Sequence, residues 1–183
     1  NEHAYDTTRI SVGGSSAGGN MALSLSARLG SERIKSCFAL YPAAHLTHPE
    51  RLDTVMGCVS DKFRSGVVIP HWCMKLFINA YTTPGTDMND PRLSPIFYDA
   101  SKFPKYVAVA CGDADTLYRM SFDLMKKISG SASGTNVDGS RKFICVLNEA
   151  HEFNTFGRTR ASQEERDRVE GEAINMIRAS WRQ

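Results

Sequence analysis

The strongest chemical signal in the sequence is a serine among glycines, in the run Gly13-Gly14-Ser15-Ser16-Ala17-Gly18-Gly19-Asn20. This run contains G-x-S-x-G centred on Ser16, after an apolar strand-like segment and before an Ala- and Leu-rich helical one. A nucleophilic serine on such a turn has a strained backbone, and small residues two before and two after it let strand and helix approach. The N–H of Ala17 would donate to the oxyanion formed on attack at a carbonyl. A phosphate-binding loop would need a lysine, which is missing here.

An acid and a base follow two later apolar runs. Asp113 and Asp115 come after residues 106–111, and His151 comes after residues 143–147. Parallel strands present their carboxyl ends at one edge of a sheet, so these side chains are expected beside the serine. The histidine would take the serine proton, and a carboxylate would orient and stabilise the imidazolium. Asp115 could instead be a helix N-cap and His151 an ordinary loop residue, but the order Ser, Asp, His favours catalysis.

The spacing of apolar residues indicates which elements would position this chemistry. Four short apolar runs predict strands of a buried parallel sheet, at residues 9–13, 36–41, 106–111 and 143–147. Helical patterns occur at residues 16–29, 117–128 and 161–181. Strands that alternate with helices predict an α/β fold, here a parallel sheet of about four strands flanked by helices.

One segment interrupts the alternation. Residues 43–90 lie between the second and third strands and are too long for a simple crossover, and they include a helical pattern at residues 71–81. Such an insertion is interpreted as a cap over the site, with surface padding as the alternative. Residues 129–140 are rich in Ser and Gly and predict a surface loop.

Several motifs resemble those of the hormone-sensitive lipase family of α/β-hydrolases, the carboxylesterases of the α/β-hydrolase fold-3 type. The run around Ser16 resembles the family's G-D-S-A-G-G-N, and Asp90-Pro91-Arg92-Leu93-Ser94-Pro95 matches D-P-x-x-S-P. Asp115-Thr116-Leu117 resembles the family's D-P-L segment, and His151-Glu152-Phe153 resembles its H-G-F. The resemblance implies nucleophile Ser16, acid Asp115 and base His151. It also implies hydrolysis of carboxylic esters with short to medium acyl chains, without metal or cofactor.

The sequence departs from this family at several positions. Ser15 replaces the usual Asp, Thr116 replaces Pro, and Glu152 replaces Gly. The H-G-G-G loop that supplies further oxyanion donors in the family does not occur in the sequence. The expectation is therefore a single α/β-hydrolase domain over residues 1–183 that corresponds to the C-terminal portion of the family's fold, without its N-terminal strands and oxyanion loop.

Composition restricts the partners. The chain has 183 residues, is 42% hydrophobic and 23% charged, and carries a net charge of +2. Its charges are scattered and no apolar run reaches membrane-spanning length, so the expected partner is a small-molecule ester rather than nucleic acid or a bilayer. The polar start and the absence of C-x-x-C predict a cytoplasmic chain with reduced thiols, buried at Cys37, Cys111 and Cys145. Nothing in the sequence indicates an oligomeric state.

Two other functions remain open from the sequence. One is a non-catalytic binding protein, or a degenerate copy of the same fold, which the missing H-G-G-G loop favours. The other is a serine peptidase of the same fold, which the segment from Asp90 to Pro95 disfavours. Turnover of a nitrophenyl ester and covalent labelling by a fluorophosphonate distinguish an esterase from a binding protein.

Overall fold

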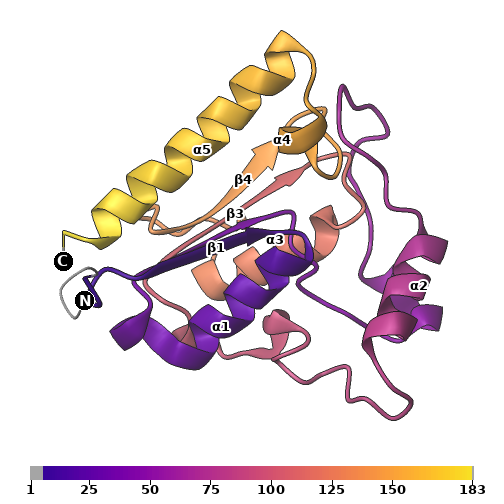
Figure 1. Cartoon of the computed structure of the whole chain (residues 1–183), viewed down its shortest axis with the longest axis horizontal. Coiled ribbons are helices and arrows are strands. Elements are labelled where there is room, and N and C mark those ends of the chain that lie inside the picture. Colours follow the sequence, from indigo (N-terminus) through magenta and orange to yellow (C-terminus); the bar gives the residue numbers. More distant parts are fainter. Residues whose placement is uncertain (1–5, 183) are drawn as a thin grey trace.

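A parallel sheet between two layers of helices forms the centre of the computed structural model, which describes residues 6–182 (Figure 1). The strands are β1 (Ser11–Ser15), β2 (Ser36–Leu40), β3 (Tyr106–Gly112) and β4 (Arg141–Val146). They lie in the order β1-β2-β3-β4, and every neighbouring pair is parallel. The predicted α/β fold class, a parallel sheet of about four strands flanked by helices, is confirmed.

Helices lie on both faces of the sheet, and one helix lies apart from it. The helices are α1 (Ala17–Arg33), α2 (His71–Tyr81), α3 (Tyr118–Ser129), α4 (Phe153–Phe156) and α5 (Arg160–Ser180), with short 3-10 turns η1 (Pro49–Thr54), η2 (Pro95–Phe97) and η3 (Ala100–Lys102). Helices α1 and α3 cover one face and α5 covers the other (Figure 1). Strand β3 is therefore buried from both sides, which explains its uninterrupted apolar sequence.

Apolar packing holds each helical layer on the sheet. Leu23 of α1 and Leu124 of α3 have no exposed surface and contact the same cluster as Val107 and Val109 of β3. On the opposite face, Val169 of α5 packs with the alternate residues of the same strand. Burying each such aliphatic side chain stabilises the fold by about 1.5–3 kcal/mol. These contacts fix the strand ends that carry the site.

The predicted and observed elements differ mainly at their ends. Strand β1 begins at Ser11 and continues to Ser15, whereas the sequence predicted its end at Gly13. The glycines stay in the strand because backbone pairing with β2 extends as far as Ser15 opposite Leu40, and this pairing needs no side chain. Helix α1 has non-helical angles at Gly30, where its end was predicted.

The segment between β2 and β3 folds around an apolar cluster of its own. Leu52, Met74 and Ile78 are almost fully buried there, together with Leu117 and Met120 from the start of α3. Helix α2 was predicted at the residues where it occurs, and it lies apart from the sheet (Figure 1). The segment is thus attached through α3 near the carboxyl ends of the strands.

The cysteines are all free, as expected. Cys37 and Cys111 are buried in the sheet, and burial raises the pKa of the Cys37 thiol to about 12. A thiol with so high a pKa is almost entirely protonated and unreactive at neutral pH. Cys145 was predicted to be buried but is partly exposed, because it lies on the edge strand β4.

Candidate active site

Ser16 lies at the turn between β1 and α1, with φ 53° and ψ −120°. Such a sparsely populated conformation costs about 1–3 kcal/mol in a residue other than glycine. The Ser16 N–H donates to the Leu40 carbonyl at 2.9 Å, which holds the turn against the end of β2. A Cβ at residue 14 would lie 2.5 Å from the Gly18 backbone, so Gly14 is required for this approach of strand and helix. The turn therefore has the strained geometry of a nucleophile elbow.

The structure brings the three sequence-predicted side chains together in one hydrogen-bonded chain. His151 Nε2 lies 3.0 Å from Ser16 Oγ, and His151 Nδ1 lies 2.8 Å from Asp115 Oδ2. With its proton on Nδ1, the imidazole donates to the carboxylate and accepts from the serine hydroxyl through Nε2. This tautomer is the one in which the ring can receive the serine proton. The Asp115 carboxylate has no exposed surface, and the His151 side chain has almost none.

The two carboxylates after β3 have different surroundings. Asp115 accepts the Leu117 N–H at 2.8 Å through Oδ1 and contacts His151 through Oδ2. The N-cap of α3 is Leu117, so Asp115 stabilises the turn before the helix and is not its N-cap. Asp113 Oδ1 accepts the Asn148 N–H at 2.7 Å. Asp113 therefore stabilises the loop after β4, and Asp115 is the carboxylate that contacts the imidazole.

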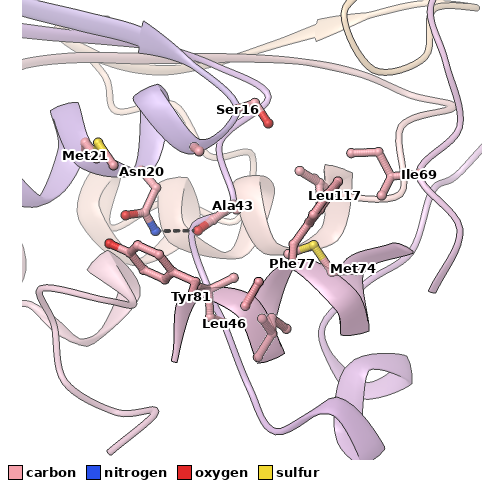
Figure 2. A pocket seen from close by; sticks show the side chains of 13 residues that line it. Ser16, Asn20, Met21, Ala43, Leu46, Ile69, Met74, Phe77, Tyr81 and Leu117 are labelled. Carbon is pink, nitrogen blue, oxygen red and sulfur yellow. Dashed lines mark hydrogen bonds between the residues drawn. The ribbon is translucent and has the colours of Figure 1, made fainter. Parts of the chain in front are cut away.

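A cavity of about 440 Å³ opens beside Ser16. Figure 2 shows side chains of α2, including Met74, Phe77 and Tyr81, across the cavity from the serine turn. The complete lining is Ser16, Ala17, Asn20, Met21, Ala43, Leu46, Ile69, Met74, Phe77, Ile78, Ala80, Tyr81 and Leu117. No lining side chain is charged, and the Asn20 amide already donates to the Ala43 and Leu93 carbonyls at 2.7 and 2.9 Å. The cavity is suited to an apolar group attached to the atom that Ser16 would attack.

A family model described as alpha/beta hydrolase fold, Abhydrolase_3, matches residues 1–154. The chain belongs to the α/β-hydrolase fold family. This finding confirms the resemblance seen in the sequence motifs, at the level of the family. A search of curated proteins gave no match to this chain.

Solved structures similar to this chain include several esterases. EstE1, a thermostable carboxylesterase cloned from a metagenomic library, is 24% identical with a TM-score of 0.72, over 98% of this chain and 57% of its own. Brefeldin A esterase, a bacterial homologue of human hormone-sensitive lipase, is 21% identical with a TM-score of 0.65, over 94% and 49%. An esterase from the archaeon Pyrobaculum calidifontis is 18% identical with a TM-score of 0.64, over 94% and 53%. This chain thus spans about half the length of those chains, and at these identities the likeness shows the fold.

Tyr41 contacts His151, the candidate base, and was not identified as a site residue from the sequence. Its ring centroid lies 4.5 Å from that of His151, and its hydroxyl donates to the Asn154 side chain. Burial raises the pKa of Tyr41 to about 12, so the hydroxyl stays protonated and remains a donor. Its position directly after β2, at the same sheet edge as Ser16, is the signal that could have identified it.

Glu152 replaces the family's glycine at a position where the backbone favours glycine. It has φ 58° and ψ 30°, a left-handed conformation that favours glycine, which the family places after the histidine. We expect Glu152→Gly to stabilise the protein by about 0.5–1 kcal/mol, because relief of backbone strain exceeds the entropy that glycine adds to the unfolded chain. The measurement is the urea unfolding free energy of both proteins.

Glu152→Ala is the control for that prediction, since alanine removes the charge but keeps the Cβ. Equal stabilisation by alanine and glycine would assign the effect to the Glu152 carboxylate instead of the backbone.

Within residues 6–182, no three His, Cys, Asp or Glu side chains are grouped closely enough to hold a metal ion. None of the helices in that part of the chain combines the length and apolarity needed to cross a bilayer.

Proposed function

We propose that this chain carries the nucleophile, base and acid of a carboxylic ester hydrolase. The observation that supports this most directly is the hydrogen-bonded chain from Ser16 through His151 to Asp115, at the carboxyl edge of a parallel sheet. Ser16 Oγ attacks the ester carbonyl carbon while His151 Nε2 accepts the hydroxyl proton. The Ala17 N–H, at the positive end of α1, donates to the oxygen that becomes negative.

The rest of the reaction consists of release of the alcohol and hydrolysis of the acyl-enzyme. The tetrahedral intermediate expels the alcohol, which takes the proton from His151, and leaves an acyl group on Ser16. Water attacks the acyl-enzyme with His151 again as base. The second tetrahedral intermediate then releases the carboxylic acid, and Ser16 Oγ takes its proton back from the His151 imidazolium. Asp115 stabilises the imidazolium formed in each step.

The substrate class follows from the cavity. Its apolar lining and volume of about 440 Å³ support esters with a short to medium acyl chain, which we place between α1 and α2. In this proposal residues 43–90 act as a cap, because α2 and the residues before it supply one wall of the cavity. The similar structures described as esterases support an ester as the substrate.

Acyl chain length tests this function. We expect kcat/KM for p-nitrophenyl esters to rise from acetate to hexanoate by at most roughly fourfold per methylene, since each buried methylene contributes about 0.8 kcal/mol. Met21→Trp should reduce this gain, because Met21 is exposed on α1 and lines the cavity. The measurement is kcat/KM over the ester series.

Met21→Leu is the matched control, since it keeps the volume of the side chain. A chain-length profile identical in Met21→Trp and the parent would show that the acyl group binds elsewhere. Covalent labelling by a fluorophosphonate without any turnover would instead favour a binding protein with a reactive serine.

A further inference from the structure

A second buried carboxylate lies two residues before His151 and takes no part in the proposed chemistry. Glu149 has no exposed surface, yet it follows β4 at the edge of the sheet. Its Oε1 accepts from Ser162 Oγ at 2.8 Å and from Arg64 Nε at 3.0 Å, and its Oε2 accepts from the Ser65 hydroxyl. These donors come from two separate parts of the chain, the segment before α2 and the first turn of α5.

The segment that supplies Arg64 and Ser65 also pairs with the backbone around the histidine. Val67 and His151 exchange two hydrogen bonds, with N–O distances of 2.7 and 3.0 Å. The Ala150 N–H donates to the Ser65 carbonyl at 3.0 Å. A Cβ at residue 66 would lie 2.4 Å from the His151 carbonyl oxygen, so Gly66, at φ 94°, allows this approach.

The same segment continues into the wall of the cavity. Ile69 lines the cavity, and its carbonyl accepts from the Thr116 hydroxyl at 3.0 Å, next to Asp115. Residues 64–69 therefore contact the loop that carries His151, the loop that carries Asp115, and the cavity. The position of His151 depends on how this segment is attached to its loop.

Stability alone does not account for a buried carboxylate at residue 149. A buried ion pair is expensive to desolvate, and an apolar replacement of similar volume is often as stable. Glu149, however, links the His151 loop to residues 64–67 and to Ser162 of α5 through directional hydrogen bonds, which an apolar side chain cannot make. The ring contact from Tyr41 approaches His151 separately.

We propose that Glu149 is a positioning residue for His151, which fixes the histidine loop against residues 64–67 so that Nε2 stays within reach of Ser16. The inference rests on the proposed function of the same site. It adds that the insertion between β2 and β3 sets the position of the base, in addition to forming a wall of the cavity.

The test replaces the carboxylate with an unbranched side chain of similar size. In Glu149→Met we expect kcat for p-nitrophenyl butyrate and the rate of fluorophosphonate labelling to fall together, by about tenfold to hundredfold, with KM little changed. Glu149→Gln keeps an acceptor and should restore both rates to within about threefold of the parent. The matched control is Glu172→Met. Glu172 lies on α5, away from the site, and its carboxylate pairs with Lys142 of β4.

A measurement that does not need activity separates this proposal from the proposed function. The His151 Nδ1–H should give a downfield proton resonance, assigned by its loss in His151→Gln. We expect it in the parent, Glu149→Gln and Glu172→Met, and broadened by solvent exchange in Glu149→Met. If the parent neither labels nor turns over esters, the proposed function fails, while this resonance still tests the positioning.

Two results would overturn the role of Glu149. One is a Glu149→Met protein with a lowered melting temperature but parental kcat, labelling rate and resonance, which would make the cluster purely structural. The other applies if Glu149→Met does not fold. Ser65→Ala and Ser162→Ala each remove one donor from the carboxylate, and unchanged rates and resonance in both would contradict the proposal.

Discussion

Replacing Ser16 with alanine should abolish covalent labelling by a fluorophosphonate and reduce ester turnover by about 10⁶. The reason is that Ser16 Oγ is the hydroxyl placed 3.0 Å from His151 Nε2, on a turn that exposes it to the cavity. Without that oxygen no acyl-enzyme can form. The measurements are the mass of the protein after fluorophosphonate treatment and the hydrolysis rate of p-nitrophenyl butyrate.

Ser15→Ala is the control, because it removes a neighbouring hydroxyl at the end of β1 and leaves Ser16 in place. It should label at the parental rate. Labelling that survives in Ser16→Ala and disappears in Ser15→Ala would transfer the nucleophile to Ser15.

Asp115→Asn should lower kcat by about 10⁴, the loss typical of a triad whose histidine takes the wrong tautomer. An amide at residue 115 presents N–H to His151 Nδ1, so the ring proton moves to Nε2 and the imidazole can no longer accept from Ser16. Steady-state hydrolysis of p-nitrophenyl butyrate measures the effect, and a melting curve shows whether the fold is kept.

Asp113→Asn is the matched comparison, with the same change two residues away. Asparagine still offers a side-chain oxygen to the Asn148 N–H, so kcat should fall by less than about tenfold. A larger loss at residue 113 than at residue 115 would reverse the roles of the two carboxylates.

The sequence was most informative where the signal is local. The elbow could be predicted because one turn needs glycine at fixed offsets from the serine, and β3 because burial on both faces leaves a continuous apolar run. The meeting of Ser16, Asp115 and His151 followed from the chain order of three strand ends. The first two inferences use rules that apply within a few residues, and the third uses the parallel order of the strands.

The contacts that were missed depend on chain segments far apart. Glu149 and Ser65 are 84 positions apart, and Tyr41 contacts His151 only after β2 and the loop after β4 are in place. The end of β1 was misplaced because ladder hydrogen bonds continue through glycines regardless of side chains. No periodicity reports such pairings, since they depend on how the insertion lies against the sheet.

The order of the strands has a consequence for how the chain folds. Within each pair β1–β2 and β3–β4, the strands are joined by a short crossover through one helix, whereas residues 41–105 separate β2 from β3. Each doubling of loop length adds only about 0.6 kcal/mol of closure entropy, but non-local pairing slows the search for the native topology. Two βαβ halves can therefore form early and join late, when β3 pairs with β2. Ser16 belongs to the first half, and Asp115 and His151 to the second. A refolding chain would consequently regain most of its helix before Ser16 comes within hydrogen-bonding distance of His151.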